Sequence, residues 1–154
     1  MRQSYLLKPG ASARVLLVDD NRNGLVARKS LLEDQGFVIT TATNGEEGFE
    51  ALSKDEFDLM ITDFKMPKMN GIELIRRARA SHPKVPIILL SGFADTLGFD
   101  ERSTGADVVI AKGNNEVSHL LRATERLLAR KVAKRPPASQ KDSRSKLSSR
   151  ARSG

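Results

Sequence analysis

Short apolar runs alternate with longer amphipathic stretches along most of the chain. Four of the runs are unbroken, as expected of parallel strands that helices cover on both faces: 15–18, 59–61, 87–90 and 108–110. A fifth run, 38–41, is more polar and fits the edge of a sheet. Strand-length runs separated by helix-length segments predict βαβ units and therefore a parallel sheet.

The segments between the runs have helical spacing. Leu25 and Leu32 lie seven residues apart in the first, and Phe49 and Leu52 follow an acidic first turn in the second. Two further segments place apolar positions on one helical face: Ile72, Ile75 and Ala78 after the N-cap candidate Asn70, and Val117, Leu120, Leu121, Thr124 and Leu128. A weak helix is expected within 95–103, which has few apolar anchors. Five strands and five helices predict a three-layer, doubly wound α/β fold.

Length and composition point to one domain outside the membrane. A chain of 154 residues is long enough for one ordinary domain and too short for two. No apolar stretch approaches the ~18 residues of a membrane span, and the first ten residues lack a secretory signal pattern. The chain has no cysteine, which excludes disulfides and thiolate metal sites. We expect a cytoplasmic protein.

The positive charge is concentrated at the carboxyl end. Residues 131–154 hold eight Lys or Arg and one Asp, a net charge of +7 that equals the charge of the whole chain. This segment has almost no apolar residues and is predicted to be a disordered tail. The expected organisation is an extension at 1–12, a domain at 13–130 and the tail at 131–154. A polybasic tail could bind nucleic-acid phosphates, but it lacks aromatic residues for stacking, so we regard nucleic acid as a weak alternative partner.

Reactive side chains follow four of the expected strands. Asp19 and Asp20 follow the first strand, Asp63 ends the third, and Ser91 and Lys112 end the fourth and fifth. Ligands of doubly wound sheets bind at the carboxyl ends of the strands, so we expect these side chains to converge. Three converging acids repel one another unless a cation compensates them, and oxygen ligands without Cys or His favour Mg2+. A hydroxyl and an amine are suited to phosphoryl oxygens.

Each of these residues also has an ordinary structural explanation. Asp19 and Asp20 could cap the helix that follows them, and Asp63 could be a turn residue. Ser91 could be a loop residue, and Lys112 a solvated surface lysine. Because the acids, the hydroxyl and the amine are all expected at one edge of the sheet, we favour the functional explanation for the set.

Four ordered motifs resemble the receiver domain of two-component response regulators, including stand-alone, chemotaxis-type members. They are VLLVDD at 15–20, TDFKMPKMNG at 62–71, LLSGFAD at 89–95 and GADVVIAK at 105–112. The resemblance implies the flavodoxin-like strand order 2-1-3-4-5. It also implies that the chain takes a phosphoryl group from a phosphohistidine on a sensor histidine kinase or a histidine phosphotransfer protein, and signals to a downstream protein through a changed binding surface. It implies no enzyme beyond its own phosphorylation and dephosphorylation.

The resemblance assigns a role to each of the acidic residues. Asp63 corresponds to the phosphoacceptor. Asp20 and Asp63 correspond to direct Mg2+ ligands, Asp19 to a ligand that acts through water, and Lys65 to the position whose backbone carbonyl also binds the metal. These roles agree with the requirements of phosphoryl transfer, which needs an in-line donor, a metal on the phosphoryl oxygens and fixed positive charge.

Ser91 corresponds to the switch hydroxyl that binds the phosphoryl group, and Lys112 to the lysine that neutralises it. The chain departs from the family pattern at two positions. Gly113 follows the lysine where the family usually has proline, and Val109 occupies the position of an aromatic residue that changes rotamer during switching. Phe93, two residues after Ser91, is the only aromatic residue near the switch hydroxyl in the sequence, and we favour ordinary packing as its role. These departures concern the output step, through the face formed by the fourth helix, fifth strand and fifth helix, more than the acceptor chemistry.

Two alternatives share part of this pattern. A pseudo-receiver would bind partners without phosphorylation, but the complete set of acids, hydroxyl and lysine argues against it. A hydrolase of the haloacid-dehalogenase type also uses a strand-end Asp with Mg2+. Its nucleophile belongs to a DxD motif on the first strand, whereas position 65 here is Lys, so no second acid is available as the general acid.

Overall fold

The computed structural model describes residues 12–92 and 98–134, with side chains described as far as residue 130. Five strands lie in this part of the chain: β1 (Arg14–Val18), β2 (Val38–Ala42), β3 (Leu59–Asp63), β4 (Ile87–Ser91) and β5 (Val108–Ala111). Five helices accompany them: α2 (Arg22–Asp34), α3 (Gly45–Lys54), α4 (Gly71–Ser81), α6 (Glu101–Thr104) and α7 (Glu116–Lys134).

The strands form one parallel sheet in the order β2-β1-β3-β4-β5. The chain therefore moves outward from β1 in one direction and then returns to build the other half, which is the doubly wound arrangement. The predicted fold class, strand order and edge position of 38–41 are all confirmed. The switch point lies between β1 and β3, where the two halves of the sheet meet.

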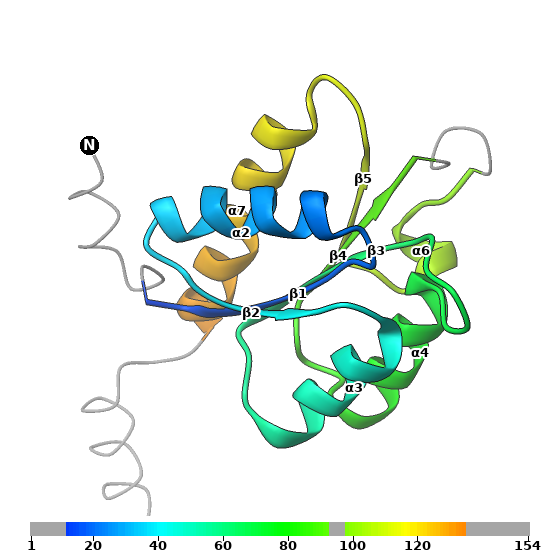
Figure 1. The fold of residues 1–154 in the computed structure, drawn as a ribbon. Helices are drawn as coiled ribbons and strands as arrows, with labels where there is room; N and C mark the ends of the chain where they lie inside the picture. The colour runs from blue at the N-terminus through cyan, green and yellow to red at the C-terminus, as the bar shows by residue number, and fades with distance from the viewer. Residues whose placement is uncertain (1–11, 93–97, 135–154) are drawn as a thin grey trace, which may run out of the picture.

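Helices cover both faces of the sheet, so the protein has three layers. In Figure 1, α2 lies above the sheet and α3 and α4 lie below it, and α7 packs against the same core as α2. Alternate residues of each central strand face opposite layers. Leu17 and Ile61 pack in the core under α2 and α7, whereas Leu16 and Met60 pack in the core over α3 and α4. The two-sided burial explains why β1, β3 and β4 are unbroken apolar runs.

Two predictions about apolar positions are wrong in detail. Val108 and Val109 are only partly buried, because β5 is the second edge of the sheet rather than a central strand. Val117 is 52% exposed, although it was assigned to the buried stripe of the last helix. The buried stripe of α7 begins one turn later, at Leu120, and includes Ala123 and Leu127.

In the described part of the segment expected to hold a weak helix, 98–103, the helix is α6, a single turn at Glu101–Thr104 with a capping box at Asp100. The preceding residues 93–97, which include Phe93, lie outside the described residues. At the other end, α7 continues to Lys134, so the first four residues assigned to the tail are helical. The rest of the tail and the extension lie outside the described residues. No described helix has the length and apolar character that crossing a membrane requires.

Candidate functional site

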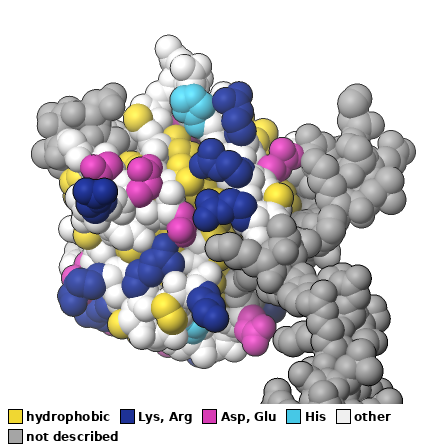
Figure 2. Space-filling view, turned by 180° about the vertical axis from the view of Figure 1, so that it is seen from behind, with side chains coloured by type: hydrophobic (Ala, Val, Ile, Leu, Met, Phe, Trp, Pro, Cys, Tyr) yellow, Lys and Arg dark blue, Asp and Glu magenta, His cyan; other side chains and the backbone are white. Residues whose placement is uncertain are grey.

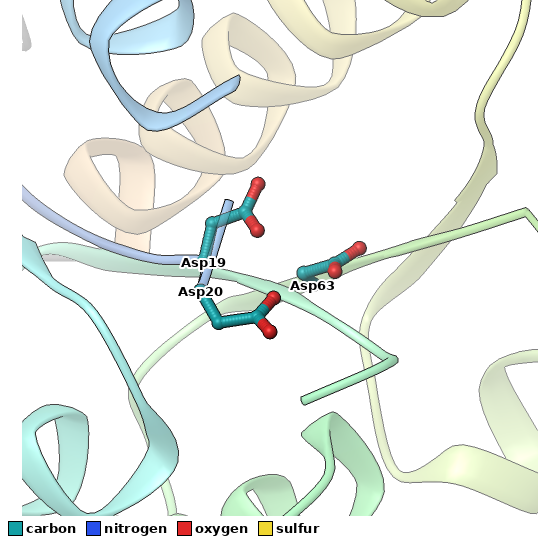
Figure 3. Close-up of side chains that lie close together, drawn as sticks. All are labelled: Asp19, Asp20 and Asp63. Atoms are coloured by element: carbon teal, nitrogen blue, oxygen red, sulfur yellow. The ribbon is translucent and has the colours of Figure 1, made fainter. Parts of the chain in front are cut away.

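Three carboxylates meet at the carboxyl edge of the sheet, next to the switch point. Asp19 and Asp20 follow β1, and Asp63 is the last residue of β3. One oxygen from each lies within 4.8 Å of the others, and Figure 3 shows the three side chains next to one another, extending to the same side. Asp19 and Asp63 are buried, whereas Asp20 is exposed. We call these three residues the acidic pocket. Their all-carboxylate chemistry fits a hard divalent cation such as Mg2+.

The capping explanation for Asp19 and Asp20 is wrong. The N-cap of α2 is Asn21, whose side-chain oxygen accepts a hydrogen bond from the Gly24 amide at 3.0 Å. The Asp19 Oδ1 atom instead accepts from the Asn21 amide at 2.9 Å, which fixes the carboxylate before the helix begins. The cap predicted at Asn70 is confirmed, since its side chain accepts from the Glu73 amide at 2.9 Å.

Asp63 is paired with the lysine that the sequence placed nearby. The Lys112 Nζ atom lies 2.5 Å from Asp63 Oδ1, and Lys112 directly follows β5. Burial raises the pKa of the Asp63 carboxyl above its ordinary value, because the charged form loses water. The hydrogen bond and charge of Lys112 oppose this rise, and the neighbouring Asp19 charge adds to it. Lys112 therefore does not fully offset the effect of burial on the Asp63 pKa, and a further cation near Asp63 would stabilise its charged form.

A close backbone contact fixes the loop after Asp63. The Phe64 amide donates to the Leu90 carbonyl, and the Gly71 amide donates to the Phe64 carbonyl, both at 2.8 Å. A Cβ atom at Gly71 would lie 2.3 Å from the backbone oxygen of Asp63. Only glycine permits this approach of the first residue of α4 to the end of β3. Lys65 lies within the loop, two residues after Asp63, and its side chain is exposed.

Ser91 and Lys112 end the neighbouring strands as expected. Ser91 is buried at the end of β4 and pairs in register with Ala111, while Asp63 pairs with Leu90. The Lys112 amide donates to the Ser91 carbonyl at 3.2 Å, which ties the two strand ends together. The structure thus brings all the predicted strand-end residues to one edge of the sheet.

The two departures from the family pattern have distinct structural settings. Gly113 has φ of +155°, a conformation that proline, with its fixed negative φ, does not adopt. Val109 is partly buried against the core over α3 and α4, and its amide donates to the Glu101 carboxylate at 3.2 Å. This bond satisfies an outward-facing amide of the edge strand.

Sequence reasoning missed a cation that contacts the acidic pocket. The Arg28 NH1 atom lies 2.7 Å from Asp19 Oδ2, and the Arg28 Nε atom lies 2.6 Å from Glu116 Oε2. A signal for it exists, because Arg28 lies three residues after Leu25 and four before Leu32, on the apolar stripe of α2. A charged residue on a buried stripe needs a partner, and Asp19, nine residues before Arg28 at the end of β1, is one candidate that the sequence offers.

A second surface feature lies at the edge strand β5. A shallow groove of about 430 Å³ runs between α6 and α7, and its lining includes Val109, Ile110 and the exposed Arg122 and Arg126 of α7. Figure 2 shows one face of the molecule, on which Lys and Arg side chains form a column beside a hydrophobic strip. The groove belongs to the face of α6, β5 and α7, on which output was expected to depend.

Comparison with known proteins identifies the family. The response regulator receiver domain family matches residues 15–124, and the chain belongs to it. It is similar to the gliding motility regulatory protein of Myxococcus xanthus, with 34% identity over 119 residues that cover 74% of this chain and 15% of that protein. It is also similar to the response regulator receiver protein CpdR of Brucella abortus, with 38% identity over 81 residues that cover 53% of this chain and 68% of that protein.

Solved structures give the same assignment. The response regulator TrrA of Thermotoga maritima, solved in complex with Mg2+ and BeF, is 32% identical, with a TM-score of 0.69 over 75% of this chain and 98% of that one. A Francisella response regulator receiver domain is 26% identical, with a TM-score of 0.72 over 78% of this chain and 99% of that one. The chain therefore corresponds to nearly all of these two solved chains, but to only a small part of the Myxococcus protein.

Proposed function

We propose that this chain accepts a phosphoryl group on Asp63 from a phosphohistidine, in a reaction that requires Mg2+. The observation that carries the proposal is the acidic pocket, in which Asp63 lies within 4.8 Å of two other carboxylates and 2.5 Å from the Lys112 amine. A nucleophilic carboxylate, a metal site and a fixed cation are the parts that phosphoryl transfer to an aspartate needs.

In this proposal Asp20 and Asp63 bind Mg2+ directly, together with the backbone carbonyl of Lys65, and Asp19 contributes through water. The bound metal would neutralise charge on the phosphoryl oxygens. The complex of the 32% identical TrrA with Mg2+ and BeF supports this role for the pocket. The donor set also supports it, because three carboxylate oxygens in one place are unfavourable without a cation.

The chain's own residues carry out the remaining steps. An oxygen of the Asp63 carboxylate attacks phosphorus, the phosphorus–nitrogen bond breaks, and its electron pair returns to the donor imidazole. Lys112 compensates the charge on the phosphoryl oxygens, and the Ser91 hydroxyl donates a hydrogen bond to one of them. Burial of Asp63 and Ser91 excludes water from the sheet side of the site.

The donor in this proposal is a sensor histidine kinase or a histidine phosphotransfer protein, and the setting is the cytoplasm. The chain acts as a signalling module and is an enzyme only toward its own phosphoryl group. We place its output at the face of α6, β5 and α7, where a downstream protein would bind. The domain boundaries at 12/13 and 130/131 remain predictions, as does weak binding of nucleic acid by the tail.

The direct test is phosphorylation of the purified full chain by a small-molecule phosphodonor with Mg2+, followed by intact-mass spectrometry. Wild type should gain one phosphoryl group, and Asp63→Asn should gain none. Asp34→Asn, which changes an exposed acid at the end of α2, is the matched control and should label like wild type. Chelation of Mg2+ should abolish labelling.

Equal labelling of Asp63→Asn and wild type would contradict the assignment of Asp63. Failure of the wild type to label or to bind beryllofluoride would favour the pseudo-receiver. Sustained turnover of an external phosphate ester would favour the hydrolase.

A further inference from the structure

Arg28 joins two acids that lie far apart in the sequence. It bonds Asp19 of the acidic pocket with NH1 and Glu116, the first residue of α7, with Nε, at 2.7 and 2.6 Å. The side chains of Arg28 and Glu116 are only 13% and 15% exposed, and Asp19 is 1% exposed. The attraction between opposite charges is stronger where water is excluded than at the surface. We call these three residues the arginine bridge.

The first turn of α2 is shaped to accommodate the bridge. A Cβ atom on Gly24 would lie 2.9 Å from Arg28 NH1 and 3.2 Å from Asp19 Oδ2. Gly24 lies one helical turn before Arg28, so the guanidinium group reaches Asp19 over bare backbone. A side chain at position 24 would therefore require the guanidinium group of Arg28 to move from its place beside Asp19.

Both carboxylate oxygens of Asp19 accept hydrogen bonds, one of them from the bridge. Oδ1 accepts from the Asn21 amide and Oδ2 accepts from Arg28. A cation that binds the pocket must therefore share Asp19 with a positive charge that is already there. Glu116 also bonds the Arg28 guanidinium group, so one positive charge interacts with two carboxylates.

We propose that Arg28 couples cation binding at the acidic pocket to the start of α7, because a cation competes with Arg28 for the Asp19 carboxylate, and Glu116 competes with Asp19 for the Arg28 guanidinium group. The proposal rests on the Mg2+ site of the proposed function. A cation at Asp19 repels Arg28 and shifts it toward Glu116. Arg28 is thus a positioning residue, and α7 receives a signal by a route that does not involve Ser91 or Val109.

The coupling gives signed expectations for Mg2+ affinity. Arg28→Gln removes the competing charge, so Mg2+ should bind more tightly, by on the order of tenfold. Glu116→Gln leaves Arg28 with Asp19 as its remaining acidic partner among the described residues, so Mg2+ should bind about threefold more weakly. In the double variant the Glu116 change should have little effect, because its route through Arg28 is gone.

The experiment measures Mg2+ binding to the unphosphorylated full chain by calorimetry for the wild type, the two single variants and the double variant. Glu125→Gln, nine residues further along α7, controls for the loss of one negative charge and should bind like wild type. Amide NMR spectra recorded during the titration should show Mg2+-dependent shifts at residues 116–120 in wild type and not in Arg28→Gln. Circular dichroism checks that each variant is folded.

The inference is overturned if Arg28→Gln binds Mg2+ like wild type or more weakly, or if the Glu116→Gln effect persists without Arg28. It is also overturned if the start of α7 does not respond to Mg2+. If Arg28→Gln does not fold, the comparison of Glu116→Gln with Glu125→Gln decides, and equal affinities refute the coupling. Because no phosphodonor is present, failure of Asp63 phosphorylation leaves these results intact. Absence of Mg2+ binding to wild type would overturn both the coupling and the metal site.

Discussion

The segments 15–18 of β1 and 59–61 of β3 are apolar and buried, whereas Asp19 and Asp63, which follow them, are buried without being apolar. Leu17 and Ile61 are fully buried among other hydrophobic side chains, so their burial stabilises the fold. Asp19 and Asp63 are almost as completely buried, yet they lie against other charges. Burial of a like-charged cluster lowers stability unless cations compensate it. Burial of side chains in the middle of the sheet thus stabilises the fold, whereas burial of the acids at its carboxyl edge destabilises it.

The largest expected effect is a loss of stability in the middle of the sheet. Leu16 is fully buried between β2 and β3, and Leu16→Ala should lower the free energy of unfolding by about 2–5 kcal/mol, measured by urea denaturation. Val26→Ala removes methyl groups from a residue that is 67% exposed and should change it by less than about 0.5 kcal/mol. Similar losses for both would remove the contrast between core and surface.

At the carboxyl edge of the sheet, a substitution at the backbone contact between Gly71 and Asp63 should have the largest effect on stability. Gly71→Ala places a Cβ atom 2.3 Å from the Asp63 carbonyl oxygen, which forces β3 and α4 apart. We expect a loss of about 1–3 kcal/mol in unfolding free energy, together with slower phosphorylation. Gly92→Ala is the matched control, because its Cβ atom would meet nothing within 4 Å. If Gly71→Ala leaves the unfolding free energy unchanged, the loop between β3 and α4 can move away from Asp63 at little cost.

Removal of the charge of Asp63 should raise stability. Because burial raises its pKa, the native state favours protonated Asp63 more than the unfolded state does. In Mg2+-free buffer at pH 7, Asp63→Asn should therefore gain on the order of 1 kcal/mol. As pH falls through the raised pKa toward the ordinary value of 3.8, wild type becomes protonated and the difference should shrink.

Urea denaturation over a pH series, with wild type and variant compared at each pH, measures this difference. Excess Mg2+ should stabilise wild type, so that at neutral pH wild type becomes more stable than Asp63→Asn. A variant that is less stable than wild type without Mg2+ would mean that the Lys112 pair outweighs the cost of burial.

The smallest expected effect concerns a buried hydroxyl far from the pocket. Thr124 of α7 is fully buried, and its hydroxyl has no hydrogen-bond partner among the described residues. Thr124→Val should raise the free energy of unfolding by about 0.5–1 kcal/mol, measured by thermal denaturation. Thr104→Val is the opposite case, because the Thr104 hydroxyl donates to the Asp100 carbonyl at 2.8 Å. This variant should lower the free energy of unfolding by about 1 kcal/mol. Equal effects would show that both hydroxyls are satisfied alike.

The sequence by itself determined the fold class, the position of each strand and the five strand-end residues of the site. It could do so because two-sided burial makes central strands continuous apolar runs, and because parallel strands end at the same edge of the sheet. The family pattern added the strand order. These features depend on local periodicity and on position along the chain, which can be read from one sequence.

Only the tertiary structure decided which charges meet and which apolar residues are covered. Arg28 and Glu116 are 88 residues apart, and nothing in the sequence pairs them. The close approach of Gly71 to Asp63, the partial burial of Val108 and the exposure of Val117 likewise depend on how α4, β5 and α7 pack. Such contacts depend on distances between elements that are remote in sequence, so local periodicity does not predict them.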